Sequence, residues 1–385
     1  MTGSFDTQFP STEDILSALI SIPTVNGNEL PAAQLLGNLL TGLGMDVSIQ
    51  DVGENRANVF AHIGNGETLL FCGHLDVVPA IGDWKTPPFI LTEDQGIFYG
   101  RGCADMKGAI AAMVSAVYRF LRSDELLNKE IALLFVADEE KDNLGAKYFI
   151  SQKRPDINYT IIGEPTEMQI AVAHKGVARF RITIHGKSAH SSVADEGINA
   201  LEGAALLIEA IKRENHKFRH IQHQILPSPS INVTVLHAGE QDNIIPGEAW
   251  MIVDYRIFPG IEEDEALKTM EVIVESVRES NPLFNFSIYR HSFLSGGEIS
   301  KDDPFVERCC SVAKMCFRDE RIPREFRATC EQSLFIDAGI KTVICGPGSI
   351  TQAHTVNEYL NQSQLIDAEQ FYYELIRSFN NSWEE

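Results

Sequence analysis

The chain has 385 residues, of which 44% are hydrophobic, and carries a formal net charge of -22. This length exceeds that of one ordinary domain and suits two. The acidic balance argues against a surface that binds nucleic acid or an anionic membrane. We find no apolar run of the roughly 18 residues that a membrane span needs. The N-terminus carries acids where a secretory signal would carry basic residues.

The cysteines indicate a reducing compartment. There are seven of them, an odd number, and none are spaced as Cys-x-x-Cys. This pattern is typical of free thiols and not of a disulfide framework. The sequence therefore predicts a cytoplasmic protein.

The N-terminal region predicts two helices and two strands. Ser11 or Thr12 can cap a first helix, whose apolar stripe ends near residue 20. A second helix is expected over residues 29–43, with Gly44 as its stop. Alternating apolar residues then predict strands over residues 47–50 and 58–63.

A histidine and an aspartate directly follow an apolar run in LLFCGHLDVVP, residues 69–79. Residues 69–72 are apolar throughout, as expected for a strand that is buried on both faces of a sheet. Sheets of α/β proteins bind ligands at the carboxyl ends of their strands, which makes His74 and Asp76 candidate site residues. Asp76 can accept a hydrogen bond from the second ring nitrogen of His74 and so orient it toward a metal. A structural His–Asp pair is the alternative for this segment alone.

A third candidate, Asp105, lies in GRGCADMKG, just before a predicted helix. The glycines resemble part of a dinucleotide-binding loop, but Asp105 stands where the third glycine of GxGxxG belongs, which argues against that function. Apolar residues at helical spacing follow from Ile110 onward. Asp105 is therefore predicted to be the N-cap of this helix, a metal ligand, or both, because a carboxylate has two oxygens.

Three more apolar strands end in polar or glycine-rich segments. The run 131–137 precedes Asp138, Glu139 and Glu140, and the run 159–162 precedes Glu164. The run 342–345 leads to Gly346, Gly348 and His354. Three consecutive acids usually form a solvated loop, but a cation would relieve the repulsion between acids at the end of a buried strand. We therefore expect these four strands to deliver their polar residues to one edge of a sheet.

The block between these strands has a different pattern. Strands are expected over residues 179–185, 231–236, 249–257 and 284–289, and helices over 199–212 and 262–280. The order β-α-β-β-α-β is that of a ferredoxin-like α+β sandwich. The sequence thus predicts an α/β domain of residues 1–174 and 293–385, with a mixed, mostly parallel sheet, and an inserted domain of residues 175–292.

The candidate ligands indicate a pair of divalent metal ions. Two imidazoles and three carboxylates without a thiolate suit zinc, cobalt or manganese. Five ligands exceed what one tetrahedral ion takes, so two ions that share a carboxylate use them better. Such a pair acidifies a water molecule and polarises a carbonyl in hydrolysis. Glu139 adjoins a ligand and is the candidate general base. The predicted ligands are His74, Asp105, Glu140, Glu164 and His354.

Five ordered motifs identify the chain as similar to the M20 family of dinuclear zinc amidohydrolases and peptidases. They read GHLDVVP, GRGCADMKGA, ADEE, IGEPT and GPGSITQAHTVNEYL, and the resemblance covers nearly the whole chain. It implies a zinc-exopeptidase-like catalytic domain with an inserted lid that also forms a homodimer. It also implies two zinc ions, with cobalt as a possible substitute, that share Asp105. His74 and Glu164 would complete one site, and Glu140 and His354 the other.

The resemblance also implies roles around the metal ions. His190, in GKSAHSS, would stabilise the oxyanion of the scissile carbonyl, and Arg256 and Asn243 would contact the substrate. A turn residue is the alternative for His190, and a surface salt bridge is the alternative for Arg256. Gly346 and Gly348 would line the substrate site. Asp76 would orient His74, and Glu139 would act as the base.

Within the family, HKGVARF and the segment around His354 look most like the acetylornithine deacetylases. This resemblance implies hydrolysis of an N-acyl amino acid, above all N-acetyl-ornithine, in arginine synthesis. The segment Thr329-Cys330-Glu331-Gln332-Ser333 departs from the Thr-Glu-Ala run usual there, and Glu331 would stand in for that glutamate as a substrate contact. The alternatives are a succinyl-diaminopimelate desuccinylase, a dipeptidase, and a catalytically silent ligand-binding protein.

Overall fold

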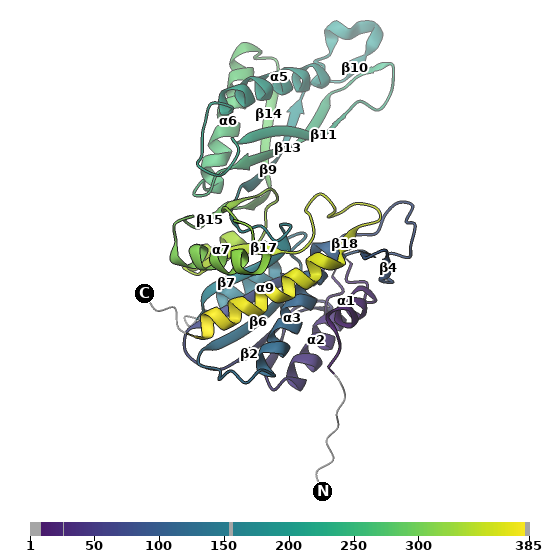
Figure 1. Ribbon diagram of the computed structural model, residues 1–385. Coiled ribbons are helices and arrows are strands. Elements are labelled where there is room, and N and C mark those ends of the chain that lie inside the picture. The colour runs from purple at the N-terminus through teal and green to yellow at the C-terminus, as the bar shows by residue number, and fades with distance from the viewer. Residues whose placement is uncertain (1–8, 26, 154–156, 382–385) are drawn as a thin grey trace. The chain divides into compact units, whose positions relative to one another are not determined.

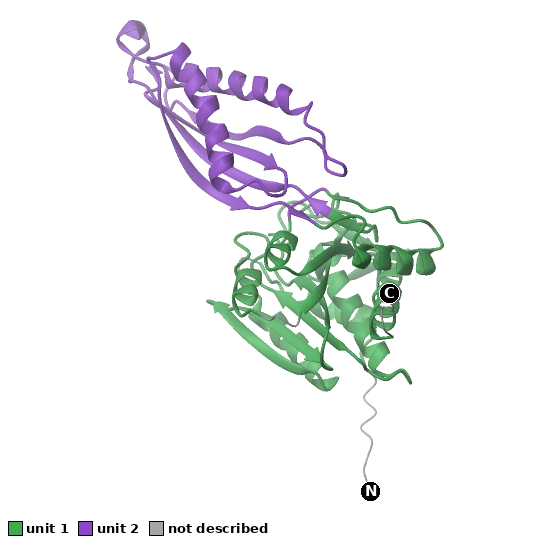
Figure 2. Ribbon diagram, turned by 90° about the vertical axis from the view of Figure 1, so that its left-hand side faces the viewer, with its two compact units in different colours: residues 1–172, 299–326, 330–385 green, residues 173–298, 327–329 purple. Residues whose placement is uncertain are grey.

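The computed structural model describes residues 9–25, 27–153 and 157–381. They form two compact units (Figure 2), of which unit 2 comprises residues 173–298 and 327–329 and unit 1 comprises the rest. The predicted boundaries were 174/175 and 292/293. The contacts divide the chain at 172/173 and 298/299.

Unit 1 is built on a mixed β-sheet. Its strand order is β1-β2-β6-β3-β7-β17-β8-β15, with β16 paired to β8. The last two residues of β8 and the whole of β15 are assigned to unit 2. The central strands β6, β3, β7 and β17 run parallel, and β1, β2 and β8 pair antiparallel with their neighbours. The strands are β1 (Asp46–Gly53), β2 (Arg56–Ile63), β3 (Thr68–His74), β6 (Glu130–Val136), β7 (Ile157–Pro165), β8 (Ala171–His174), β15 (Gly297–Glu298), β16 (Arg324–Phe326) and β17 (Lys341–Gly346).

Burial explains why the central strands are apolar without alternation. Every residue of β3 and of β6 is buried, because parallel strands in this position are covered on both faces. Helices α3 and α9 lie side by side against the sheet (Figure 1). This architecture confirms the predicted α/β class. The helices of unit 1 are α1 (Thr12–Ile20), α2 (Leu30–Gly42), α3 (Gly108–Leu121), α4 (Leu144–Ser151), α7 (Pro304–Phe317), α8 (Gln332–Asp337) and α9 (Gln362–Asn380).

Local sequence signals account for the first helix. Ser11 caps α1, and the Asp14 side chain in turn accepts from the Ser11 backbone N–H, which forms a capping box. A separate three-stranded sheet contains β4 (Thr92–Asp94), β5 (Ile97–Tyr99) and β18 (Tyr359–Asn361). Its strands bring residues near 100 and near 358 together, although they are far apart in the sequence.

Unit 2 has the predicted ferredoxin-like topology. Its strands are antiparallel in the order β11-β13-β9-β14, and helices α5 and α6 pack against each other and on the sheet. Helix α5 extends to Phe218, beyond the predicted end at residue 212, because Phe218 itself packs in the core. The elements are β9 (Gly176–His185), α5 (Ala200–Phe218), β11 (Ser230–Ala238), β13 (Glu248–Ile257), α6 (Glu263–Ser280) and β14 (Asn285–Leu294), with the short pair β10 (Ala189–His190) and β12 (Ile244–Ile245).

Candidate metal centre

The central parallel strands place the predicted ligands at one edge of the sheet. His74 is the last residue of β3, Glu164 lies near the end of β7, and Glu140 follows β6. Because these strands are parallel, their carboxyl ends meet. The prediction of a shared edge is therefore confirmed. Helix α3 begins after the turn η1 (Cys103–Lys107), which holds Asp105.

One group of side chains surrounds His74, whose ring is almost fully buried. Its Nε2 lies 3.0 Å from Oδ1 of Asp105 and 3.6 Å from Oε1 of Glu164. A second group surrounds His354, which is half exposed. Its Nε2 lies 2.9 Å from Glu140 and 3.4 Å from Oδ2 of Asp105. Asp105 therefore directs one oxygen toward each imidazole, as a carboxylate shared by two ions would.

The donor set suits a transition metal. Ligand atoms of His74, Asp105 and Glu140 lie within 4.8 Å of one another, and so do those of His74, Glu139 and Glu164. Imidazole and carboxylate ligands without thiolate favour zinc and its neighbours in the first transition row. Glu139 falls within ligand distance in the second group, so the geometry alone allows it to be a ligand or a base.

The pKa shifts of the clustered groups also favour a bound divalent cation. Burial and the charge of Asp105 raise the pKa of Glu164 well above its usual range. Burial lowers the pKa of His74, but the hydrogen bond to Asp105 and the negative charges of Asp105, Glu164 and Asp76 together outweigh burial and raise this pKa well above its usual range. In the metal-free protein, protons on Glu164 and His74 thus reduce the repulsion between the carboxylates. A divalent cation would compensate these negative charges more fully. The residues present therefore fit a divalent metal.

The predicted role of the Asp76 carboxylate was wrong in its detail. Nδ1 of His74 donates to the main-chain carbonyl of Asp76 at 2.9 Å, whereas the Asp76 carboxylate lies 3.8 Å away. That carboxylate instead accepts the backbone N–H groups of Glu139 at 3.1 Å and Glu140 at 3.0 Å. Asp76 therefore orients His74 through its backbone and positions the acidic loop through its side chain.

The N-cap interpretation of Asp105 was also wrong. The N-cap of α3 is Lys107, which makes no side-chain capping bond, and the Asp105 carboxylate is directed to the two histidines. Lys107 is fully buried and donates from Nζ to the carbonyls of Leu19 and Ile22 at 3.0 Å each. The turn that carries Asp105 is thus tied to the end of α1.

Glu331 lies in a closed environment. Its side chain is fully buried, its Oε1 accepts from the Cys72 thiol at 3.7 Å, and its Oε2 has no hydrogen-bond partner in the described structure.

The backbone geometry favours glycine at the two predicted positions Gly346 and Gly348. A Cβ at Gly346 would lie 2.0 Å from the carbonyl oxygen of Gly163, and Gly348 has a φ of +86°. Their predicted substrate contacts stay predictions.

Three predicted residues belong to unit 2. His190 pairs with Ile244 in the short β10–β12 ladder. The main-chain carbonyl of Asn243 accepts from the N–H of Ser191 at 2.9 Å, so His190 and Asn243 are neighbours. His190 is exposed, and its Nδ1 lies 2.7 Å from the Ser192 hydroxyl. Arg256 donates from Nε to Asp254 at 2.7 Å and from Nη1 to Thr329 at 3.1 Å. The surface salt bridge considered for Arg256 is therefore present.

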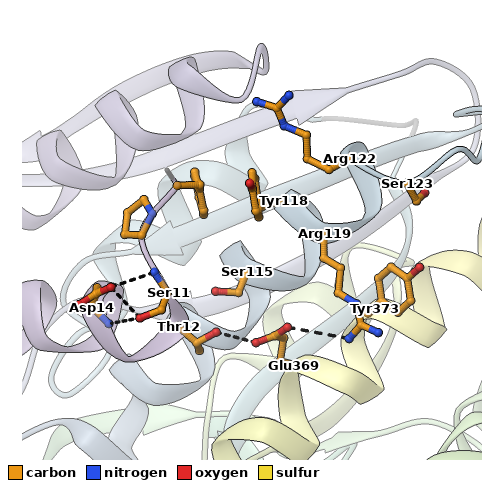
Figure 3. Close-up of a pocket in the computed structure, with 12 residues that line it drawn as sticks. Ser11, Thr12, Asp14, Ser115, Tyr118, Arg119, Arg122, Ser123, Glu369 and Tyr373 are labelled. Carbon is orange, nitrogen blue, oxygen red and sulfur yellow. Dashed lines mark hydrogen bonds and ion pairs between the residues drawn. The ribbon is translucent and has the colours of Figure 1, made fainter. Parts of the chain in front are cut away.

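A cavity of about 900 Å³ lies elsewhere in unit 1, between α1, α3 and α9 (Figure 3). Tyr118, Arg119 and Tyr373 line it, and Glu369 accepts from Thr12 at 2.6 Å. None of its described lining residues is a histidine or a cysteine. It therefore does not compete with the cluster of His74 and His354 as a metal centre.

Fold and site together define a metal-dependent hydrolase with a two-unit architecture. Residues 70–378 match the peptidase family M20/M25/M40. The acetylornithine deacetylase of Aliivibrio fischeri (strain MJ11) is 33% identical over 92% of this chain and 94% of its own length. The chain belongs to the M20/M25/M40 peptidase family.

Two solved structures support the fold. An M20-family metallo-carboxypeptidase from Sulfolobus solfataricus aligns with a TM-score of 0.80 at 20% identity, over 97% of this chain and 100% of that one. A dinuclear metal-binding M20 peptidase from Bacillus subtilis aligns with a TM-score of 0.73 at 16% identity, over 96% and 98%. In the described residues, moreover, every helix is too short or too polar to cross a membrane.

Proposed function

We propose that this chain hydrolyses the amide bond of N-acyl amino acids, with N-acetyl-ornithine as its substrate in cytoplasmic arginine synthesis. The observation that carries the proposal is Asp105, whose two oxygens are directed at His74 and His354. Each of these histidines also lies beside a glutamate, Glu164 or Glu140. Two zinc ions held there would polarise the acyl carbonyl and acidify a water molecule.

The residues of this chain would then divide the work. Glu139 takes a proton from the attacking water and passes it to the leaving amine. Burial raises the pKa of Glu139 well above its usual range in the metal-free protein. His190 donates to the oxyanion, and Arg256 and Asn243 contact the carboxylate end of the substrate. Glu331, Gly346 and Gly348 line the amino-acid side of the site. Unit 1 is the catalytic domain, and unit 2 is the lid.

The substrate is tested by release of free amine from a panel of amides, with and without zinc or cobalt. We expect metal-dependent turnover with the highest kcat/KM on N-acetyl-ornithine. Preference for N-succinyl-diaminopimelate or a dipeptide would keep the chemistry and change the substrate, and would direct attention to the segment around Glu331. Bound metal without cleavage of any amide would contradict the proposal and favour a silent binding protein.

We also propose that unit 2 forms a homodimer through its sheet edge. Strand β11 is an edge strand and exposes Val235 and Leu236. Leu236→Lys should raise the dimer dissociation constant about 30-fold or more, because a lysine on an edge strand opposes pairing. Sedimentation velocity measures this change, and Val272→Lys, on the exposed face of α6, is the matched control. A wild-type chain that sediments as a monomer at every concentration would contradict the dimer.

A further inference from the structure

A buried glutamate that the sequence analysis assigned no role, Glu358, holds the turn that carries Asp105. Its Oε1 accepts the backbone N–H groups of Ala104 at 2.9 Å and Asp105 at 3.0 Å. Its Oε2 accepts the N–H of Gly102 at 2.9 Å and Nη1 of Arg101 at 2.6 Å. Four donors from five consecutive residues therefore converge on one carboxylate.

The Glu358 carboxylate fixes the backbone of the turn that carries Asp105, which no local capping interaction holds in the described part of the chain. Gly102 has a φ of +87°, and the turn around Asp105 departs from helical geometry before α3 begins. Among the described residues, no side chain makes a capping hydrogen bond to the start of α3. The N–H groups of Ala104 and Asp105 are therefore satisfied by Glu358, a residue more than 250 positions away in the sequence.

The same glutamate ties this turn to the second predicted histidine ligand. His354 lies four residues before Glu358 in a turn, with a φ of +63°. The carbonyl of Glu358 accepts from the N–H of Gly100 at 3.1 Å, and Nη2 of Arg101 donates to the carbonyl of Thr355 at 3.2 Å. One compact network thus connects the backbones around Asp105 and His354.

A fully buried carboxylate is costly unless its oxygens are satisfied. Here both oxygens are used, and the bonds end at the backbone of Asp105, the carboxylate directed at both histidines. Arg101 is itself buried and lies 5.1 Å from the Trp84 ring centre, which restricts its guanidinium. Hydrogen-bonding partners behind metal ligands orient them and tune affinity.

We propose that Glu358 is a positioning residue of the metal centre, which holds Asp105 and His354 at the spacing that two ions require. The inference rests on the proposed function for the presence of metal. Beyond the proposed function, the position of Asp105 relative to His354, which come from distant segments, depends on the carboxylate of Glu358.

The test is Glu358→Gln in the full chain, measured by calorimetric titration with zinc and by the visible spectrum of bound cobalt. The amide places an N–H₂ group against Gly102 and Arg101 or against Ala104 and Asp105, so two of the four bonds are lost. We expect zinc affinity to fall about 10- to 100-fold. We also expect a changed cobalt spectrum, because the geometry of the ligands changes. With saturating metal, kcat should fall while KM stays near its wild-type value.

Glu130→Gln is the matched control. Glu130 is a buried carboxylate at the opposite end of β6, and it accepts from Thr68 at 3.0 Å. This variant loses a buried charge without contact to the turn of Asp105, so its zinc affinity and cobalt spectrum should match the wild type. If Glu358→Gln lowers only the melting temperature, as Glu130→Gln does, and binds metal normally, Glu358 is merely structural and the proposal is overturned.

A second variant decides the question if Glu358→Gln does not fold. Arg101→Lys keeps the charge but cannot reach both Glu358 and the Thr355 carbonyl, so zinc affinity should fall about 10-fold. Wild-type affinity in Arg101→Lys would overturn the proposal. A wild-type chain that binds no zinc and cleaves no amide would instead refute the proposed function, whatever the variants do.

Discussion

Glu139→Gln is expected to bind zinc like the wild type and to lose about 10²- to 10⁴-fold in kcat, the usual contribution of a general base. Glutamine is nearly isosteric but cannot accept a proton. The backbone N–H of residue 139 would still donate to Asp76, so the loop and Glu140, the proposed neighbouring ligand, keep their place. Turnover of N-acetyl-ornithine at saturating zinc and a calorimetric zinc titration measure the two effects.

Asp142→Asn is the control for this variant. Asp142 lies on the same loop, is exposed and pairs with Lys141, and its loss should leave kcat unchanged. Glu139 also lies within ligand distance of His74 and Glu164. A Glu139→Gln variant that loses zinc would therefore make Glu139 a ligand, and one that keeps full turnover would show that another group is the base.

Zinc affinity is expected to rise at least about 100-fold between pH 6.5 and pH 8.5, because binding must displace protons from the centre. Hydrogen bonds to Asp105 and Glu140 raise the pKa of His354 from 6.5 to about 10. Its proton stabilises the metal-free fold fully below pH 6.5, and this contribution is lost as the pH rises through about 10. The increase in melting temperature on adding zinc should therefore be larger at pH 8.5.

Titrations in two buffers of different ionisation enthalpy count the protons released. His354→Gln should reduce both the zinc affinity and the number of protons released, whereas His185→Gln, a histidine bonded to Ser287 in unit 2, should change neither. An affinity that does not vary with pH would show that His74 and His354 are already neutral in the metal-free protein. It would argue against their hydrogen bonds to Asp105 and Glu140.

The central strands could be predicted because burial on both faces leaves a continuous apolar run, as in β3 and β6. The ferredoxin-like unit could be predicted because apolar residues recur at helical spacing in its helices and alternate with polar residues in its strands. The end of α5 was less predictable, because Phe218 extends the helix through a core contact that local pattern does not encode.

The site divides in the same way. His74, Glu140 and Glu164 stand just after or at the ends of apolar strands, so their place could be predicted from the run before them. The hydrogen-bond partners of the Asp76 carboxylate could not be predicted. The sequence places His74 nearby, but the carboxylate accepts the backbone N–H groups of Glu139 and Glu140 instead. Glu358 gave a weak signal, a lone acid directly before the apolar residues of β18.

By itself, the sequence determined the two-unit organisation, the residue types of the candidate metal centre and the family, because periodicity and motifs are local properties of the chain. Only the tertiary structure decided which atoms meet. Asp105 reaches both His74 and His354, and Glu358 reaches the backbone of Asp105, because the sheet and the β5–β18 pairing bring distant segments together. Hydrogen bonds between such segments depend on ångström-scale distances that no local pattern specifies.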